Sequence, residues 1–357
     1  MFFIKKNKEK IHCFIISGFL SSAANYRSYN LSIALRKQGI STLVICENKR
    51  ANLSFIENLK MHGIQVRTFS ENKILLSILK TRVFLWEFNP SFIYQTNPTI
   101  RAFLSLFLTP YTLIGEWDEP ELLKFERGFK KKLAQILHYW FLRKSKIRIS
   151  CTKYYKKFIP ESFYIPHGQY INDKFDLTDK SSEKEKYFVY LGNFYKLWDH
   201  DLLFKGLSKA KKNNFSPLVK FIGNGPEYKK WVDYAKENKL GNIKFEGFLN
   251  HNDLMKILYS AHALLFPMRD TPLNKSRCPS KIFAYIASKR PIIAHNVGEI
   301  KSLLGGKANL YPPKVDLIEI LRDLPDNLNE VDYDNKKFSY EIIAKKYIKL
   351  INGIDKH

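Results

Sequence analysis

Residues 221–267 read FIGNGPEYKKWVDYAKENKLGNIKFEGFLNHNDLMKILYSAHALLFP, and they give the clearest indication of the fold. Short apolar runs suited to strands alternate here with longer amphipathic runs suited to helices, and glycine-containing turns lie between them. Strands joined by helical stretches of this length form parallel βαβ units with right-handed crossovers. The stretch therefore predicts part of a parallel sheet covered by helices.

The same alternation extends over the rest of the chain. In the first half it predicts strands at Ile11–Ser17, Thr42–Cys46, Gln65–Phe69, Phe92–Gln95, Thr112–Gly115 and Arg148–Cys151. In the second half it predicts strands at Tyr187–Gly192, Val219–Gly223, Ile243–Glu246, Ala263–Pro267, Pro291–His295 and Asn309–Tyr311. The helical stretches between them include Tyr29–Gln38, Phe129–Arg143, Glu227–Asn238 and Asp253–Ala261. The 357 residues exceed the roughly 250–300 at which one core stops growing, so two Rossmann-like α/β domains are predicted.

The domain boundaries follow from composition. Residues 172–186 read NDKFDLTDKSSEKEK, which is polar, charged and nearly free of large apolar side chains, as a linker is. We expect an N-terminal domain at 1–171 and a C-terminal domain at 187–337. The last amphipathic stretch, within 338–354, is expected to form a helix that packs back onto the first domain.

The charge of the chain is strongly positive and unevenly distributed. Lys and Arg number 59 against 34 Asp and Glu, a net charge of +25, and the segment Leu122–Lys157 holds twelve basic residues and a single acid. Such a field attracts a polyanion: nucleic acid, an anionic membrane or a nucleotide-charged substrate. A solvated basic face is the alternative. The aromatic residues do not interleave with the basic ones in a nucleic-acid-binding motif, so a nucleic-acid-binding protein is the least favoured class and no nucleic-acid partner is expected.

Cysteine usage and hydropathy narrow the class of protein. The four cysteines lie far apart and form no CxxC pair, which predicts neither a metal site nor a disulfide framework and favours a reduced, cytoplasmic setting. The most apolar stretch, residues 100–115, contains Arg101 and Pro110 and is shorter than the ~20 residues that a spanning helix needs. No transmembrane helix is expected, and the first residues lack a secretion signal.

Four segments together resemble the glycosyltransferases called group 1 or family 4, which have the GT-B fold. Residues 221–267 resemble the order of elements in the second domain of that family, and residues 279–304 resemble its donor-site helix and following strand. Residues 17–45 resemble its first βαβ unit, and residues 164–175 the strand and turn before its linker. The resemblance implies transfer of a sugar from a nucleotide-sugar to a glycan or lipid-linked acceptor. It also implies retention of configuration, no metal or other cofactor, and a role in bacterial surface polysaccharide or glycolipid synthesis.

The donor-binding candidates lie at the ends of predicted strands. In open parallel sheets, ligands bind at the carboxyl ends of the strands, where glycine lets the backbone approach and helix N-termini offer N–H groups to phosphate. Gly18, Phe19 and Gly223 follow predicted strands and are assigned to the donor, with ordinary turns as the alternative. Phe248 and Leu249 lie where the backbone of the resembling family meets the nucleobase.

The donor site departs from the family pattern at four positions. Ser276 and Ala284 replace two glutamates that contact the donor sugar and the ribose. Asn193 and Trp198 replace an arginine and a lysine that bind the diphosphate, although Asn193 remains a donor-binding candidate. A leaving nucleoside diphosphate still needs cationic or N–H donors. The nearby loop 268–281 supplies cations, and we expect the diphosphate to be held by Arg277, Ser280 and Lys281. A solvated basic loop is the alternative.

The acceptor candidates lie in GEWDEPE, residues 115–121, directly after a predicted strand. Asp118 and Glu116 are the catalytic candidates, because a carboxylate there could act as general base toward an acceptor hydroxyl or bond sugar hydroxyls. Trp117 stands where the family commonly has histidine and could stack on a sugar, and Glu119 is a second acceptor-binding candidate. Capping of a helix by Asp118 is the alternative. A carboxylate base would suit inversion rather than retention.

The following segment, residues 122–148, has apolar side chains at helical spacing with lysine and arginine around them. This pattern is typical of a basic amphipathic helix at an anionic membrane surface, so the inner face of the cytoplasmic membrane is a candidate location. A crossover helix with a basic outer face is the alternative. The missing glutamates also leave open a non-catalytic subunit of the same fold that supports an active partner.

Overall fold

The computed structural model describes residues 10–16, 20, 23–69, 74–118, 128–169, 185–196, 198–334 and 336–354. The chain divides into two compact units. Unit 1 comprises Met1–Tyr170, Ser276–Cys278 and Lys337–His357, and unit 2 comprises Ile171–Lys275 and Pro279–Lys336. The end of the chain therefore returns to the unit in which it began.

The described part of unit 1 contains a seven-stranded parallel sheet in the order β3-β2-β1-β4-β5-β6-β7. Its strands are β1 Ile11–Ile16, β2 Ser41–Glu47, β3 Gln65–Phe69, β4 Phe92–Thr96, β5 Thr112–Trp117, β6 Ser145–Ser150 and β7 Phe163–Tyr164. The order runs outward from β1 to β3 and then resumes at β4 on the other side. Ligands of such sheets bind where the order reverses, beyond the carboxyl ends of the strands.

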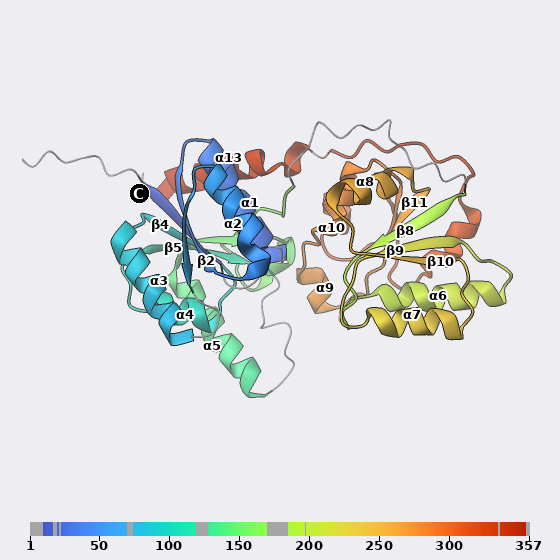
Figure 1. Ribbon diagram of the computed structural model, residues 1–357, viewed down its shortest axis with the longest axis horizontal. Coiled ribbons are helices and arrows are strands. Elements are labelled where there is room, and N and C mark those ends of the chain that lie inside the picture. The colour runs from blue at the N-terminus through green and yellow to red at the C-terminus, as the bar shows by residue number, and fades with distance from the viewer. Residues whose placement is uncertain are drawn as a thin grey trace, which may run out of the picture. The chain divides into compact units, whose positions relative to one another are not determined.

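Helices cover both faces of this sheet (Figure 1). They are α1 Ala23–Lys37, α2 Leu53–Met61, α3 Ile74–Phe88, α4 Ile100–Leu106, α5 Phe129–Lys144 and α13 Tyr340–Ile354. On one face α13 packs against α1, and its buried Tyr340, Ile343 and Tyr347 join the core of unit 1. On the other face α3 packs against α4, and α4 against α5.

Unit 2 contains, in its described part, a six-stranded parallel sheet in the order β10-β9-β8-β11-β12-β13. Its strands are β8 Tyr187–Leu191, β9 Leu218–Ile222, β10 Ile243–Gly247, β11 Ala263–Phe266, β12 Ile292–His295 and β13 Asn309–Tyr311. Its helices are α6 His200–Lys212, α7 Tyr228–Glu237, α8 His251–Ser260, α9 Pro272–Ser276, α10 Lys281–Ala287, α11 Ile300–Leu304 and α12 Leu317–Ile320. The core beneath α6 and α7 is rich in aromatic rings, and Phe204 stacks on Phe221 and Trp231.

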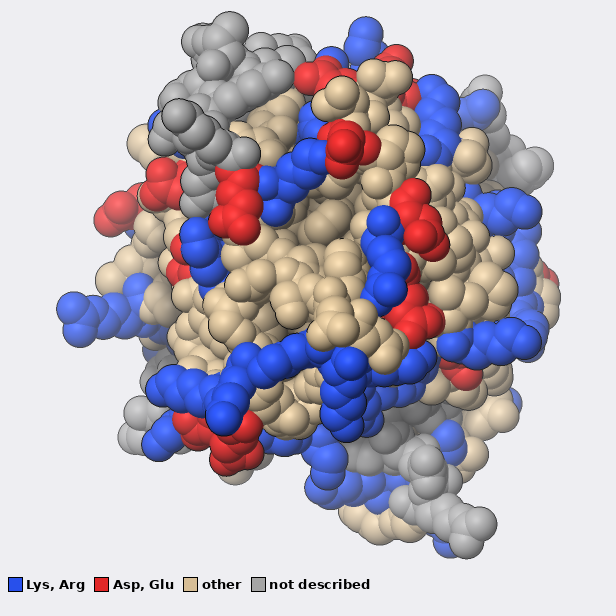
Figure 2. Space-filling model, turned by 90° about the vertical axis from the view of Figure 1, so that its right-hand side faces the viewer, with Lys and Arg blue, Asp and Glu red and all other residues tan. Residues whose placement is uncertain are grey.

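The basic excess is partly balanced by ion pairs on the surface. Figure 2 shows Lys and Arg spread over one face of the molecule, with Asp and Glu next to several of them. In unit 2, Lys209 pairs with Glu319 at 2.6 Å, and Lys230 pairs with Glu227 at 2.9 Å. Exposed pairs of this kind contribute little stability, but they interrupt a continuous positive surface.

Two parallel sheets with helices on their faces confirm the predicted α/β architecture of two Rossmann-like domains. Each predicted strand begins and ends within three residues of an observed one. Strand β7 and several helices, α2, α3 and α4 among them, were not named from the sequence. The predicted linker, residues 172–186, lies outside the described residues except for its last two. Among the residues that the structure describes, no helix is both long and apolar enough to cross a bilayer.

Candidate functional site

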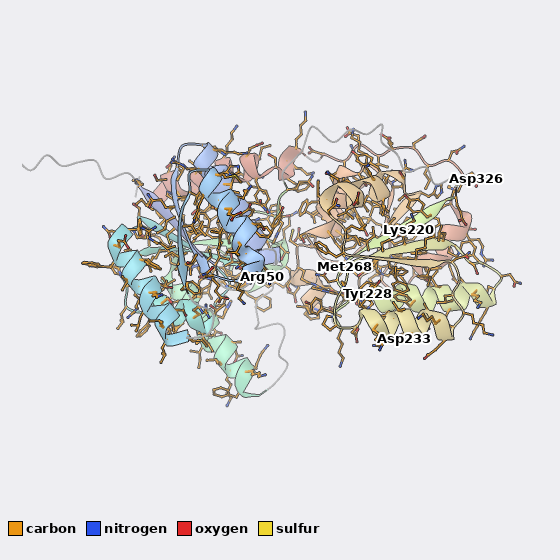
Figure 3. All side chains as sticks on the ribbon, viewed as in Figure 1. Arg50, Lys220, Tyr228, Asp233, Met268 and Asp326 are labelled. Atoms are coloured by element: carbon orange, nitrogen blue, oxygen red, sulfur yellow. The ribbon has the colours of Figure 1, made fainter. Side chains whose placement is uncertain are left out.

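The carboxyl ends of the strands in unit 2 bring together residues that are far apart in the sequence. Gly192 follows β8, Gly223 follows β9, Phe248 follows β10 and Met268 lies two residues beyond β11. Because neighbouring strands are parallel, these four positions lie along one edge of the sheet. Figure 3 labels Met268 there, together with Tyr228 at the start of α7. This edge is where a parallel sheet binds its ligand.

The loops after β8 and β9 pack directly against each other. The backbone N–H of Phe194 donates to the Asn224 carbonyl at 3.0 Å, and that of Gly192 donates to the Ile222 carbonyl at 2.9 Å. Gly223 has a φ of +130°, and a Cβ atom there would lie 2.2 Å from the Gly192 carbonyl oxygen. Gly223 is therefore required by the approach of two loops, while the neighbouring Asn193 stays exposed.

Lys281 provides a positive charge at this edge. It is the first residue of α10, and its Nζ atom lies 4.4 Å from the ring centroid of Tyr190 and 4.9 Å from that of Phe266. A Cβ atom on Gly192 would lie 2.9 Å from the same Nζ. The ammonium group is thus held next to the backbone at the end of β8 by two aromatic rings, in a cation–π arrangement. Ser280 precedes it and makes no side-chain capping bond.

The other cations of the loop are engaged elsewhere. Arg269 donates to Asp199 at 2.8 Å and to Asp201 at 2.6 and 2.7 Å, and these carboxylates raise its pKa. Lys275 pairs with Asp270. Arg277 is only 5% exposed and belongs to unit 1, whereas Lys281 belongs to unit 2. Of the three residues expected to hold the diphosphate, Arg277 thus belongs to unit 1 and Ser280 and Lys281 belong to unit 2, where the Lys281 ammonium lies beside Gly192.

Phe248 presents its ring to solvent just after β10. Its side chain is 85% exposed, and it follows Gly247, whose φ is +68°. Leu249 beside it is half-buried, and Asn250 then caps α8 by accepting from the Asp253 N–H at 3.0 Å. An exposed ring fixed between a strand and a capped helix can stack on a flat ligand group.

The positions of the missing glutamates are occupied by small side chains. Ser276 is fully buried and Ala284 is half-buried on α10. Glu299, which the sequence reasoning did not single out, is a buried carboxylate at the start of α11, just beyond β12. The Gly298-Glu299 pair, shortly after the strand predicted at Pro291–His295, was the signal that could have identified it.

In unit 1, Glu116 is enclosed in a buried ion pair. Arg27 pairs with one of its carboxylate oxygens, and the Tyr94 hydroxyl donates to the other. The guanidinium group of Arg27 also donates to the carbonyl of Pro166 at 2.6 Å and of Ile165 at 3.2 Å. Burial raises the pKa of Glu116 even though Arg27 opposes the shift. The predicted catalytic role of Glu116 does not fit, because the carboxylate is wholly buried and bound by Arg27 and Tyr94.

Asp118 is paired with a histidine from a distant part of the sequence. Its Oδ2 lies 3.0 Å from Nε2 of His167, and its Oδ1 accepts from the Cys151 thiol at 3.2 Å. Its backbone N–H donates to Asn97 at 2.8 Å. Burial opposes ionisation of Asp118, but His167 and the hydrogen bonds outweigh it, so the pKa of the carboxyl is lowered. Asp118 can orient the His167 ring and keep a charge beside it.

Trp117 lies in the core and not at a binding surface. Its side chain is fully buried, its ring packs on Phe141 with centroids 4.7 Å apart, and its N–H donates to His138 Nδ1 at 3.1 Å. The predicted stacking of Trp117 on an acceptor sugar is therefore wrong, because Phe141 and His138 enclose its ring in the core. The calls on Gly18, Phe19 and Glu119 lie outside the described residues.

One group of side chains could hold a metal ion. Ligand atoms of Asp118, Cys151 and His167 all lie within 4.8 Å of one another, and all three residues are buried. Burial and the nearby Asp118 charge raise the pKa of the Cys151 thiol well above its usual value. The thiol therefore acts as a hydrogen-bond donor to Asp118, whereas metal ligation requires the thiolate.

Comparison with known families finds a match within the second half of the chain. Residues 185–325 match the model described as "Glycosyl transferases group 1". These residues include Gly192, Gly223, Phe248 and Lys281. A search of curated proteins found no match.

Solved structures resemble the whole chain. A glycosyltransferase from Rickettsia africae has a TM-score of 0.72 at 12% identity and covers 98% of this chain and 99% of its own. Anabaena HepE in complex with UDP-glucose has a TM-score of 0.72 at 15% identity, with 96% and 99% covered. Sucrose-phosphate synthase from Thermosynechococcus elongatus has a TM-score of 0.72 at 13% identity, with 97% and 99% covered. At these identities the likeness shows a shared fold.

Proposed function

Residues 185–325 are a group 1 glycosyltransferase domain within a chain of the GT-B fold, and from this premise we propose that the protein transfers a sugar from a nucleotide-sugar to a glycan or lipid-linked acceptor. The observation that carries the proposal is the position of Lys281. Its ammonium group lies beside Gly192, at the end of β8, on the edge of the sheet that also exposes Phe248. That edge offers a cation for a diphosphate and a flat ring for a base.

The donor site is built on unit 2. The diphosphate lies at Lys281 and the loop of Asn193, where a fixed charge stabilises the negative charge that develops on the leaving nucleoside diphosphate. The nucleobase stacks on Phe248 next to Leu249. A uridine nucleotide is the first to test, because HepE was solved with UDP-glucose. No metal takes part in the donor site that we propose.

The acceptor site is built on unit 1. The Asp118–His167 pair lies just beyond the carboxyl end of β5 and takes the place of the His-Asp pair of the resembling family, with the histidine supplied by another segment. His167 and Asp118 are themselves only 2% and 3% exposed, so the pair positions the chain at the end of β5 for the acceptor and does not contact it directly. Glu116 is closed off by Arg27, so it supplies no base to an acceptor hydroxyl. Asp118 is bound by His167 and Cys151, so neither carboxylate is offered to an acceptor hydroxyl. This suits retention of configuration, which we include in the proposal.

The biological setting follows from the same proposal. The enzyme works in the cytoplasm, at the inner face of the membrane, and extends a bacterial surface polysaccharide or glycolipid. The basic residues of α5, within the segment 122–148, bring it to anionic lipid.

A second candidate is a non-catalytic subunit of the same fold. The observation that favours it is the pair of small residues, Ser276 and Ala284, at the two glutamate positions of the family. Both candidates include nucleotide binding, and only the first includes turnover.

The test is a titration of the chain with nucleoside diphosphates and nucleotide-sugars while its thermal stability is followed. A ligand of the folded state adds about 2.7 kcal/mol of stability at a hundredfold excess over its Kd. We expect one nucleotide class to stabilise the protein, and Lys281→Ala to weaken its affinity ~10-fold or more because a charged hydrogen-bond partner is lost. Lys275→Ala is the matched control, since Lys275 already pairs with Asp270. No stabilisation by any nucleotide would contradict the proposal.

A further inference from the structure

One face of unit 1 exposes apolar side chains over three adjacent helices. We call the surface of α3, α4, α5 and the turn after α4 the α3–α5 face; Figure 1 shows the three helices on the same side of the sheet. Of the twenty large apolar side chains exposed in the described residues, thirteen lie on this face. They are Ile74, Leu75, Leu76, Leu79, Val83, Trp86, Ile100, Leu104, Phe107, Leu108, Phe129, Ile136 and Tyr139.

Helix α3 contributes most to this surface. Trp86 is 81% exposed and Leu75 is 75% exposed, while the opposite side of the same helix buries Ile78 and Leu85. Monomeric proteins do not normally expose apolar side chains in such a continuous group unless the surface meets a partner. On the other side of the sheet, α1 is covered by α13, whereas α3 packs against α4 and leaves Trp86 and Leu75 exposed.

The charges around these apolar side chains are almost all positive. Helices α3, α4 and α5 carry eight Lys and Arg and a single acid, Glu87. Glu87 pairs with Arg67 of β3 at 3.4 Å. Long basic side chains can extend from an apolar surface and place their charge at a neighbouring polar layer. The apolar centre and basic surroundings together match an anionic lipid surface.

A groove on α5 also combines apolar or aromatic side chains with basic ones. It is lined by Ile136, Tyr139, Trp140, Arg143 and Lys144. Tyrosine and tryptophan are enriched at the level of lipid headgroups because their rings are apolar at one end and polar at the other. Arg143 at the end of the helix places a cation where lipid phosphates lie, while Lys144 donates to the Thr109 carbonyl.

We propose that the α3–α5 face docks unit 1 onto an anionic lipid bilayer, with α3 inserting its apolar side chains among the headgroups. The helices that follow parallel strands begin at the carboxyl edge of the sheet, so Ile74, Ile100 and Phe129 start their helices at the edge where Asp118 lies. Docking therefore presents the acceptor edge of unit 1 to the bilayer surface. The inference rests on the proposed function only in naming a lipid-linked molecule as the acceptor.

The test measures cosedimentation of the full chain with lipid vesicles. Wild type should bind vesicles of phosphatidylglycerol and phosphatidylcholine in equal parts, bind pure phosphatidylcholine weakly, and lose affinity as salt rises. The triple variant Leu75→Ser, Leu79→Ser, Trp86→Ser should bind anionic vesicles ~10-fold or more weakly, because apolar burial drives insertion. The control Leu53→Ser, Met61→Ser alters exposed residues of α2, on the opposite face, and should bind as wild type does.

A second readout follows the tryptophan itself. Fluorescence of wild type should shift to shorter wavelength on anionic vesicles, and the shift should be largely absent from Trp86→Phe. Unchanged vesicle binding by the triple variant, or equal binding to neutral and anionic vesicles, would overturn the proposal. Self-association of wild type through this face, without binding to vesicles, would also overturn the proposal.

The two proposals fail separately. The triple variant should keep the nucleotide affinity of wild type, because its substitutions lie on unit 1, whereas Lys281 and Phe248 belong to unit 2. A wild type that binds nucleotide but no vesicle overturns docking and the membrane setting proposed above, and leaves the proposed transfer reaction standing. A wild type that binds vesicles but no nucleotide overturns the proposed sugar transfer and leaves the docking proposal standing.

Discussion

His200 lies fully buried at the start of α6, with its ring 5.0 Å from that of Phe194 and 5.4 Å from that of Trp231. Burial lowers the pKa of His200 from 6.5 to about 4. Between these two values the unfolded chain binds a proton that the folded chain does not, so stability rises with pH. We expect unit 2 to lose up to ~3 kcal/mol as pH falls from 6.5 to 4, at about 1.4 kcal/mol per pKa unit.

Urea denaturation between pH 4 and 8 measures this dependence. His200→Gln should flatten the curve over that window, although its loss of packing lowers stability at every pH. His251→Gln, a substitution of an exposed histidine on α8, should leave the slope as in wild type. An equal slope in wild type and His200→Gln would show that another group is responsible.

Single residues of the site were predicted unevenly. The places of Phe248 after a strand and of Lys281 at the start of a helix could be read from the chain, whereas their roles at the donor stay predictions. Glu116 and Trp117 belong to a strand that is buried on both faces. The four acidic residues in this short stretch suggested exposure, so the burial could not be read from the sequence. The partners of Asp118 lie 33 and 49 residues further along the chain, at Cys151 and His167, and no local pattern joins them.

Gly223 tests the close packing of the loops after β8 and β9. Its φ of +130° is costly for any residue with a Cβ atom, and that atom would lie 2.2 Å from the Gly192 carbonyl oxygen. Gly223→Ala should cost ~2 kcal/mol or more from backbone strain and displacement of the loop. It should also weaken nucleotide binding, because the same displacement moves the backbone beside Lys281.

Thermal denaturation compares this variant with Gly241→Ala. Gly241 lies before β10 with no atom within 4 Å of its added Cβ, so the control should melt close to wild type. A Gly223→Ala variant as stable as Gly241→Ala would mean that the two loops do not approach as described.

Secondary structure was predicted well wherever apolar periodicity follows burial. Strands such as β3 and β13 begin and end at the predicted residues, because turn residues bound short apolar runs. Helix α3 was not among the helical stretches named, and apolar residues around much of its circumference give it no clear helical period. The apolar residues that deprive α3 of a helical period include Trp86 and Leu75, which are exposed.

At the scale of the whole molecule, the proposal places donor binding on unit 2 and acceptor and membrane binding on unit 1. Unit 2 carries the cation and the exposed ring for a nucleotide, and unit 1 carries the Asp118–His167 pair and the α3–α5 face. The alternation of strands and helices predicted both sheets, since each βαβ unit is a local feature. The sequence did not predict how the side chains behind the net charge of +25 are distributed over the surface. On unit 2, ion pairs such as Lys209–Glu319 separate the basic side chains. On α3, α4 and α5, basic side chains lie around exposed apolar ones.

Release of nucleoside diphosphate from a panel of nucleotide-sugars, with and without lipid-linked acceptors, tests the central claim most directly. The account predicts turnover of one class of donor, slowed by ~10²-fold in Lys281→Ala, because a fixed charge that meets the leaving group is lost. Lys275→Ala should turn over as wild type does. Nucleotide binding without release from any donor, in the presence of every acceptor, would contradict transfer and identify the chain as a non-catalytic subunit.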